Sequence, residues 1–317
     1  MEMQTKAILA LMALPPLLSE LMSGWMPASA FFQPITLLIE FLGYSLPVLI
    51  IREVAARRKL GLAGIIMLGM AYGIFNEGLG SKSILSNPHT VNPAYTDYGY
   101  ILGMNLPWAL NVMIWHSLSS VLFPILFVHY MYPDVKSKPW LGKKTTIALA
   151  IPSAIFVTIF FFSPYPFAVA NPVIYFAVLV SSILALALVA MLMPKSGGLK
   201  ESRCGIKSLF LGMAFLLAFG IGATWIAGAK ASIVLFFSYV AGIPLLFAFV
   251  LRIKNWLTVP ALVLFGLGFY IILGISGISD STAKGYPEGL ITGIIFEIAL
   301  IWATLRIRKS QKRRKNG

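Results

Sequence analysis

The chain has 317 residues, of which 58% are hydrophobic and only 11% are charged. Charged residues make up roughly a quarter of a soluble globular domain, so this composition excludes that class and indicates a polytopic membrane protein. The formal charge of +14 would suggest nucleic-acid binding in a soluble protein. Here the basic residues form short clusters between apolar segments, as topology signals do, so we expect no nucleic-acid partner.

Ten apolar segments follow one another along the chain, each of about the 20 residues that cross roughly 30 Å of hydrocarbon. Small residues at 28–30 resemble a signal-peptide cleavage site behind the first segment, but Pro15, Pro16 and Glu20 favour a retained helix. We therefore predict an all-α bundle of about ten transmembrane helices. The expected spans are residues 7–26, 31–51, 60–80, 106–131, 145–164, 173–193, 208–227, 231–251, 256–275 and 290–305.

The basic residues agree on a direction for these spans. Of the 25 Lys and Arg residues, 22 fall on one side and only Lys82, Lys230 and Lys284 on the other. By the positive-inside rule, both termini are cytoplasmic in a multi-pass protein of the cell (plasma) membrane. The lipid bilayer is its expected partner, and the sequence does not indicate any protein partner.

The basic tail from Arg306 to Lys315 is of the size that binds anionic lipid beside a helix. A stop-transfer anchor is the simpler interpretation of the same tail, and we favour it.

Acidic and polar side chains gather in the first four predicted helices. A lipid-facing carboxylate costs about 2.5–3.5 kcal/mol, so Glu20 and Glu40 should face protein or a water-filled cavity. His116 lies about ten residues into the fourth helix, and Glu77 lies within a turn of the outer end of the third. We expect these four residues to meet in the extracytoplasmic half of the membrane.

The third helix carries Gly69, Gly73, Glu77 and Gly80 on one face. Small residues at this spacing allow a second helix to approach closely, so Glu77 is expected to face a neighbouring helix. An alternative is that Glu77 pairs with Lys82 at the membrane surface.

The other polar residues also have simpler interpretations. His116 can serve as an interior hydrogen-bonding residue, and Glu20 can bind backbone groups freed by Pro15 and Pro16.

Four segments resemble an uncharacterised family of multi-pass proteins from archaea and bacteria. They are PPLLSELMSG (15–24), LPVLIIRE (46–53), AYGIFNEGLGSKS (71–83) and GMNLPWALNVMIWHSLSSVLFPI (103–125). The family segments run roughly GELLSG, YGIxEEGLxxKS and GVNWxWAxxLxxxH, and the resemblance covers about residues 10 to 145. Asn76 departs from the pattern, because it stands where the family has the first Glu of a pair. The family has no assigned activity, so the resemblance implies site residues but no function: Glu20, Glu77, Lys82, Asn105, Trp108 and His116.

A weaker resemblance is to glutamic intramembrane proteases of the CAAX-processing kind, which carry EExxxR and FxxxH motifs. Here Asn76-Glu77 breaks the acidic pair, and Lys82 is five residues after the Glu. If the protein is an enzyme, Glu77 and His116 are the expected catalytic residues. The outer half of the membrane offers a single intramembrane His and the sequence has no HExxH, so it gives no metal site. The single cysteine gives no redox motif, so we expect no metal and no cofactor.

We predict that residues 1–145 form a four-helix region carrying the site, and that residues 146–317 form a supporting six-helix region with the basic tail. Our leading hypothesis is binding or transport of a small solute or ion through an outward-facing polar pocket. An intramembrane hydrolase and a non-catalytic scaffold are the alternatives, so the sequence leaves open whether the chain is an enzyme. The candidate binding residues are Glu20, Glu40, Asn76, Glu77, Lys82, Asn105, Trp108 and His116.

Overall fold

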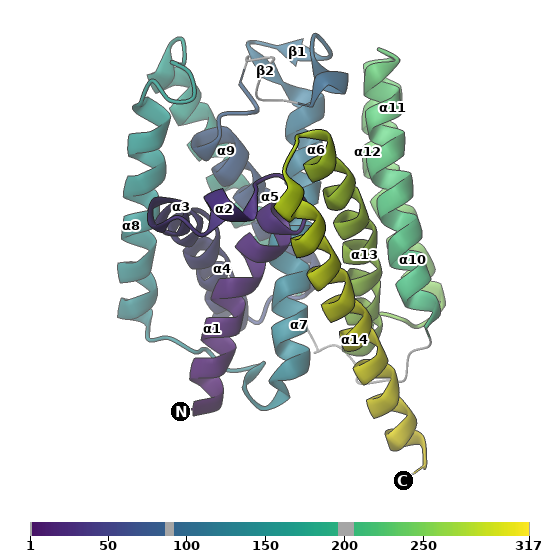
Figure 1. Ribbon diagram of the computed structural model, residues 1–317. Helices are drawn as coiled ribbons and strands as arrows, with labels where there is room; N and C mark the ends of the chain where they lie inside the picture. The colour runs from purple at the N-terminus through teal and green to yellow at the C-terminus, as the bar shows by residue number, and fades with distance from the viewer. Residues whose placement is uncertain (1, 86–91, 196–205, 317) are drawn as a thin grey trace.

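The computed structural model describes residues 2–85, 92–195 and 206–316, without the side chains of residues 308 and 310–316. Its helices stand side by side in a bundle, and both chain termini lie at the same end (Figure 1). The α-helices are α1 (Glu2–Pro16), α2 (Ala28–Phe31), α3 (Pro34–Glu40), α4 (Leu46–Arg58), α5 (Leu62–Ile74), α6 (Leu106–His116), α7 (Phe123–Met131), α8 (Lys143–Phe162), α9 (Pro172–Leu192), α10 (Lys207–Leu216), α11 (Gly222–Gly228), α12 (Ile233–Ile253), α13 (Val259–Ala283) and α14 (Pro287–Asn316). An antiparallel hairpin of β1 (Tyr100–Ile101) and β2 (Met104–Asn105) lies at the end opposite the termini.

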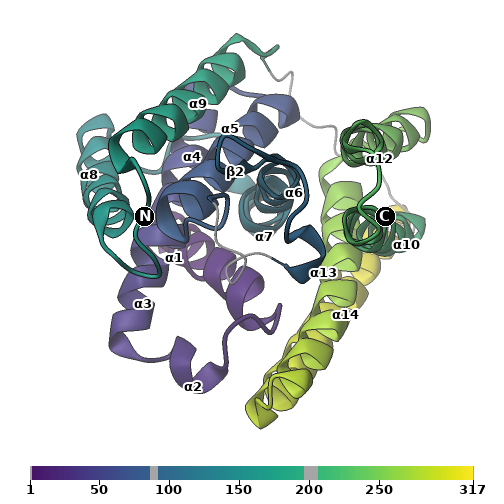
Figure 2. The same cartoon turned by 90° about the horizontal axis from the view of Figure 1, so that it is seen from above.

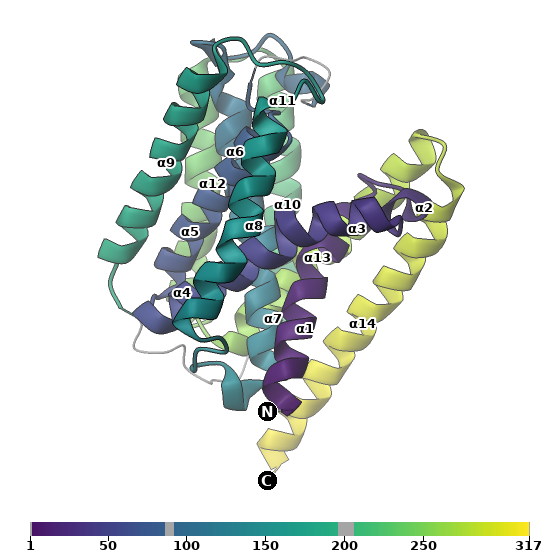
Figure 3. The same cartoon turned by 90° about the vertical axis from the view of Figure 1, so that its left-hand side faces the viewer.

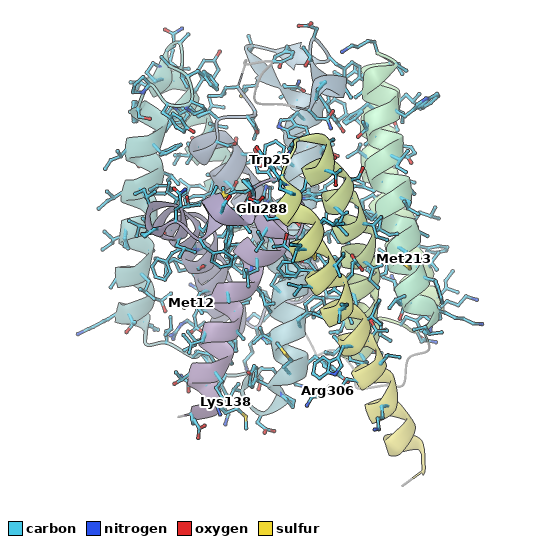
Figure 4. The ribbon with its side chains drawn as sticks, in the orientation of Figure 1. Met12, Trp25, Lys138, Met213, Glu288 and Arg306 are labelled. Atoms are coloured by element: carbon cyan, nitrogen blue, oxygen red, sulfur yellow. The ribbon has the colours of Figure 1, made fainter. Side chains whose placement is uncertain are left out.

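Nine helical segments of the described residues are long and apolar enough to cross a membrane, which confirms the all-α membrane bundle. They lie at nine of the ten expected positions. Lys138 and Arg306 both lie at the end that carries the termini (Figure 4), in agreement with the sorting of basic residues. The nine segments are Pro34–Arg58, Leu62–Gly80, Leu106–Met131, Lys143–Phe162, Pro172–Leu192, Lys207–Gly228, Ile233–Ile253, Val259–Ala283 and Pro287–Ile307.

The expected first span, residues 7–26, was wrong in its bounds. The first helix begins at Glu2 and ends at Leu21, and it is not among the nine apolar segments. The chain leaves this helix through Gly24, whose φ of 69° is the left-handed conformation that suits glycine. Figure 3 shows the result: α3 lies across the bundle axis and then bends into α4. The second span, expected over residues 31–51, is therefore a bent helix.

The bend between α3 and α4 lies at one of five π-helical segments in the described residues. In a π-helix the backbone hydrogen bonds skip one more residue than in an α-helix, and such turns are rare and frequent at functional sites. Four of the five lie in the first half of the chain, each continuing directly from an α-helix. The five segments are Leu17–Leu21, Phe41–Ser45, Phe75–Gly80, Ser117–Leu122 and Leu217–Ile221.

Prolines beside these segments leave backbone carbonyls free, since proline has no N–H to donate to the carbonyl four residues earlier. Pro16 leaves the carbonyl of Met12 free, and Ser45 Oγ donates to it over 2.6 Å. Pro47 leaves the carbonyl of Gly43 free, and Tyr72 OH donates to it over 3.0 Å. Neighbouring helices thus satisfy the freed carbonyls, as a lipid environment requires.

Seen from above, α6 and α7 occupy the middle of the bundle, with α13 beside them (Figure 2). These helices form the two spans with the largest buried share, Leu106–Met131 and Val259–Ala283. Phe123 of α7 packs against Phe265 and Phe269 of α13, with ring centroids 6.0 and 5.4 Å apart. The two halves of the chain thus pack against each other through this interface. The division into a site-bearing region, residues 1–145, and a supporting region, residues 146–317, stays a prediction.

Candidate functional site

The site is centred on a glutamate and a histidine from neighbouring helices. Glu77 lies in the π-helical segment after α5, and His116 is the last residue of α6. Their side chains meet with 3.0 Å between Glu77 Oε1 and His116 Nε2. An added Cβ would come within 2.6 Å of Ser117 Cα at Gly69 and within 2.7 Å of Met113 Cα at Gly73. The glycine face therefore lets α5 lie close to α6 and to the π-helical segment that follows it, as expected.

The second oxygen of the Glu77 carboxylate accepts hydrogen bonds from two serines. Ser81 Oγ donates over 2.7 Å, and Ser83 Oγ is a second donor. Trp108 Nε1 donates in turn to Ser83 Oγ over 2.8 Å. Trp108 is therefore connected to Glu77 through one serine, and Glu77 accepts three hydrogen bonds.

The other nitrogen of His116 extends the network to the first helix. His116 Nδ1 lies 2.8 Å from Ser120 Oγ, and Ser120 Oγ lies 2.8 Å from Ser19 Oγ. Ser120 is fully buried and Ser19 nearly so. A continuous series of hydrogen bonds thus runs from Glu77 through His116 and Ser120 to Ser19.

Glu20, next to Ser19 in the chain, brings a second carboxylate to the same region. Tyr44 OH donates to Glu20 Oε1. Glu20 interacts electrostatically with Glu77 and His116, and Glu40 interacts with Glu20. We call Glu20, Glu40, Glu77 and His116 the acidic cluster. Glu77 and His116 are in direct contact, whereas Glu20 and Glu40 are linked to the cluster by electrostatic interaction only, so a site shared by all four residues stays a prediction.

Aromatic rings pack around the acidic cluster. The His116 ring lies 6.1 Å from the Tyr44 ring and 5.6 Å from the Tyr72 ring, between centroids. Tyr72 also stacks on Phe75 at 6.1 Å. Asn76, a predicted site residue, donates from Nδ2 to Tyr72 OH over 3.1 Å and so joins the edge of this region.

Two other predicted residues have structural roles outside the acidic cluster. Lys82 does not pair with Glu77, because its amine donates to the carbonyls of Ser163 and Phe167 over 2.8 and 3.1 Å. This contradicts the alternative in which Glu77 pairs with Lys82 at the membrane surface. Asn105 caps α6 by accepting from Trp108 N over 2.9 Å, and its amide also holds the loop before β1.

The cluster is sheltered but not sealed. The Glu77 side chain is 17% exposed and that of His116 is 4% exposed, and Glu20 is half-buried. A hollow of about 380 Å³ lies elsewhere, near the N-terminus, and none of the predicted site residues lines it. The outward-facing pocket therefore stays a prediction. The hollow is lined by Glu2, Met3, Lys6, Met131, Tyr132, Pro133 and Asp134.

Ser120, His116 and Glu77 are hydrogen-bonded in the order found in a serine hydrolase triad, but their surroundings do not suit that chemistry. Ser120 has no exposed surface, so a substrate carbonyl has no approach to its hydroxyl. Glu77 as a base for water would act with three of its roughly four acceptor positions already filled. Within the described residues, no three His, Cys, Asp or Glu side chains gather closely enough to hold a metal ion.

A buried ion pair, neither member of which the sequence analysis named as a site residue, lies in the middle of α4. Arg52 and Glu53 are 1% and 0% exposed and pair at 2.6 Å. Arg52 Nη2 donates to the carbonyls of Val135, Lys136 and Lys138, and its guanidinium lies 3.4 Å from the centre of the Trp140 ring. One feature of the sequence could have indicated this buried pair. Arg52 and Glu53 are adjacent, have opposite charges and directly follow an apolar run.

The chain from residue 9 to residue 307 matches the sequence profile of a family described as an uncharacterized membrane protein family. The match extends through the second half of the chain, beyond the residues 10–145 on which the resemblance was based. No curated protein and no solved structure showed significant similarity to the chain.

Proposed function

The chain belongs to an uncharacterised family of membrane proteins, and we propose that it binds and transports a small solute or ion at the acidic cluster, with Glu77 and His116 exchanging protons. The observation that carries this proposal is the hydrogen-bonded series from Glu77 through His116 and Ser120 to Ser19. Imidazole and hydroxyl groups both donate and accept, so the series offers a route for a proton between α5 and α1. Intramembrane Glu and His chains are the usual proton relays of pumps and transporters.

The acidic cluster is more costly than helix packing requires, and this supports binding over a purely structural scaffold. A buried carboxylate lowers stability unless it is paired, and apolar residues of similar size could lock the helices together at no such cost. Glu40 is 5% exposed and its Oε2 has no hydrogen-bond partner in the described part of the chain. A group of this kind is retained where a ligand or proton occupies it.

Reconstituted vesicles test the proposal. The full chain is placed in liposomes that enclose a pH-sensitive dye, and proton movement is followed while a panel of amines, amino acids and inorganic cations is added outside. We expect at least one solute to drive proton movement in the wild type, and Glu77→Gln to abolish it. Glu297→Gln is the matched control, because Glu297 is a carboxylate of a spanning segment that lies outside the acidic cluster.

Two results would overturn the proposal. One is wild-type vesicles that move no proton with any solute of the panel. The other is Glu77→Gln vesicles that move protons as fast as the Glu297→Gln control does.

A further inference from the structure

Two serines that donate to Glu77 stand on either side of a fully buried lysine. Ser81 Oγ donates to Glu77 Oε2 over 2.7 Å, and Ser83 Oγ donates to the same oxygen. Lys82, between them, is 0% exposed and donates through its amine to two carbonyls of the connection between α8 and α9, over 2.8 and 3.1 Å. The serines thus reach Glu77 while the lysine between them reaches another pair of helices.

The backbone of Lys82 adopts a conformation that suits glycine. Its φ is 59°, in the left-handed region that the Cβ of an ordinary residue disfavours. Glycine is the usual residue just after a helix that ends in this way, as the segment Phe75–Gly80 does here. A lysine at this position needs a contact that holds the turn. Within residues 2–85, 92–195 and 206–316 Lys82 makes no ion pair, so its two hydrogen bonds to carbonyls supply that contact.

The amine end of Lys82 is enclosed by the hairpin that α8, α9 and their connection form. Its Nζ lies 6.0 Å from the centre of the Phe161 ring and 5.8 Å from that of the Phe167 ring, within the range of cation–π attraction. Leu79 and Leu85, before and after the turn, belong to the same hydrophobic cluster as Phe161. The turn that carries the two serines is therefore packed and hydrogen-bonded to the α8–α9 hairpin.

The α8–α9 hairpin lies at the rim of the bundle, beside α4 and α5 (Figure 2). Its two spans are among the least buried of the nine in the described residues. Helices with few buried contacts shift at a lower free-energy cost than central helices do. Because Lys82 is hydrogen-bonded to the connection of this hairpin, such a shift acts on the turn that carries Ser81 and Ser83.

We infer that Lys82 is a positioning residue of the site, because its hold on the α8–α9 connection keeps the hydroxyls of Ser81 and Ser83 on Glu77. The inference rests on the proposed function and adds its regulation: the position of the α8–α9 hairpin sets how many donors Glu77 has when it exchanges a proton. Release of the connection removes two of the three hydrogen bonds that Glu77 accepts and leaves the one from His116.

Nuclear magnetic resonance of the purified full chain, carrying isotopically labelled histidine in detergent micelles, tests the inference at His116. Its ring nitrogen signals report on the contact with Glu77, and they are assigned by their loss in His116→Gln. Lys82→Met removes the two hydrogen bonds and keeps an unbranched side chain in apolar surroundings, without a buried charge. We expect it to shift the His116 signals in the same direction as the double variant Ser81→Ala/Ser83→Ala does. A cooperative unfolding transition checks that each variant is folded.

Lys230→Met is the matched control. Lys230 is also a left-handed lysine, with a φ of 51°, and its amine donates to the carbonyl of Thr96, away from the two serines. Lys230→Met should leave the His116 signals at their wild-type positions.

Lys82→Gly separates positioning from packing. Glycine adopts the left-handed turn without a side chain to hold it, but it leaves a larger void than methionine does. If Lys82 acts on the turn, the His116 signals of Lys82→Gly stay closer to the wild type than those of Lys82→Met, although Lys82→Gly unfolds at the lower temperature. Unchanged His116 signals in Lys82→Met, an equal shift in Lys230→Met, or signals closer to the wild type in Lys82→Met than in Lys82→Gly would overturn the inference.

The outcome is separable from that of the proposed function, because the spectra need neither a solute nor proton movement. Unchanged His116 signals in Lys82→Met, together with Glu77-dependent proton movement in vesicles, would contradict the positioning role and leave transport standing. Shifted signals in a protein that moves no proton with any solute would contradict proton-coupled transport and leave the positioning role standing.

Discussion

His116 Nε2 lies 3.0 Å from Glu77 Oε1 at the point where α5 and α6 are held together by closely packed glycines. The pair therefore does two things at once. It ties two central helices together near the end of their contact, and through Nδ1 of the same imidazole it connects Glu77 to Ser120. A change in the protonation of Glu77 or His116 would therefore change which groups donate and accept along the whole hydrogen-bonded series.

A double-mutant cycle measures this relationship. Glu77→Gln and His116→Ala should each lower the stability of the protein, and the double mutant should lose less than the sum of the two. The expected coupling free energy is about 1 kcal/mol or more, as for other residues in direct contact within one network. Unfolding of the purified chain in mixed micelles of increasing SDS content provides the measurement. A cycle of His116→Ala with Glu297→Gln is the control, and additivity in both cycles would contradict a direct pair.

The carbonyl of Gly43 gives a second prediction. Tyr72→Phe removes the hydroxyl that satisfies this carbonyl and should cost about 1–3 kcal/mol of stability. In a Pro47→Ala background the new backbone N–H can donate to the same carbonyl, so Tyr72→Phe should cost clearly less there. The unfolding temperatures of the wild type, the two single variants and the double variant test this prediction. Equal costs in the two backgrounds would mean that the proline does not determine the need for the tyrosine.

Helix positions and the burial of the intramembrane carboxylates could be predicted from the sequence, for a clear physical reason. Apolar runs such as residues 106–131 must be about as long as the bilayer is thick, and the observed span has the same bounds. Intramembrane carboxylates must avoid lipid, so Glu20, Glu40 and Glu77 were expected to face inward. Glu40 is buried and Glu20 and Glu77 are half-buried, while a pocket that joins the three carboxylates stays a prediction.

The path of the first two helices could not be predicted in this way. Hydropathy detects length and composition but does not detect the π-helical turns at Leu17–Leu21 and Phe41–Ser45, the second of which joins α3 to α4 where the helix bends. Pro16 and Pro47 marked both places, yet a proline in a helix permits a kink, a π-turn or a straight continuation. The deciding partners, Ser45 and Tyr72, come from other helices and are known only once the helices are packed.

Close packing of α5 against α6 gives a third prediction. Gly73→Ala places a methyl group 2.7 Å from the Cα of Met113, so it should cost about 1–3 kcal/mol through displacement of α6. Gly242→Ala in α12 is the matched control, because an added Cβ there meets nothing within 4 Å. The control should keep or slightly raise stability, since alanine favours helix over glycine. An unfolding temperature of Gly73→Ala equal to that of Gly242→Ala would contradict the close approach.

The last prediction concerns Arg52, whose planar guanidinium bonds three backbone carbonyls of the connection between α7 and α8 and also the Glu53 carboxylate. Lysine retains the charge but cannot reach these acceptors together, so Arg52→Lys should release the connection. The expected readout is faster trypsin cleavage at Lys136 and Lys138 of the purified protein. The exposed Arg58 of the same helix supplies the control, and Arg58→Lys should be cut at the wild-type rate. If Arg52→Lys is also cut at that rate, the connection is held by the Glu53 bonds to the backbone N–H groups of Trp140 and Leu141 instead.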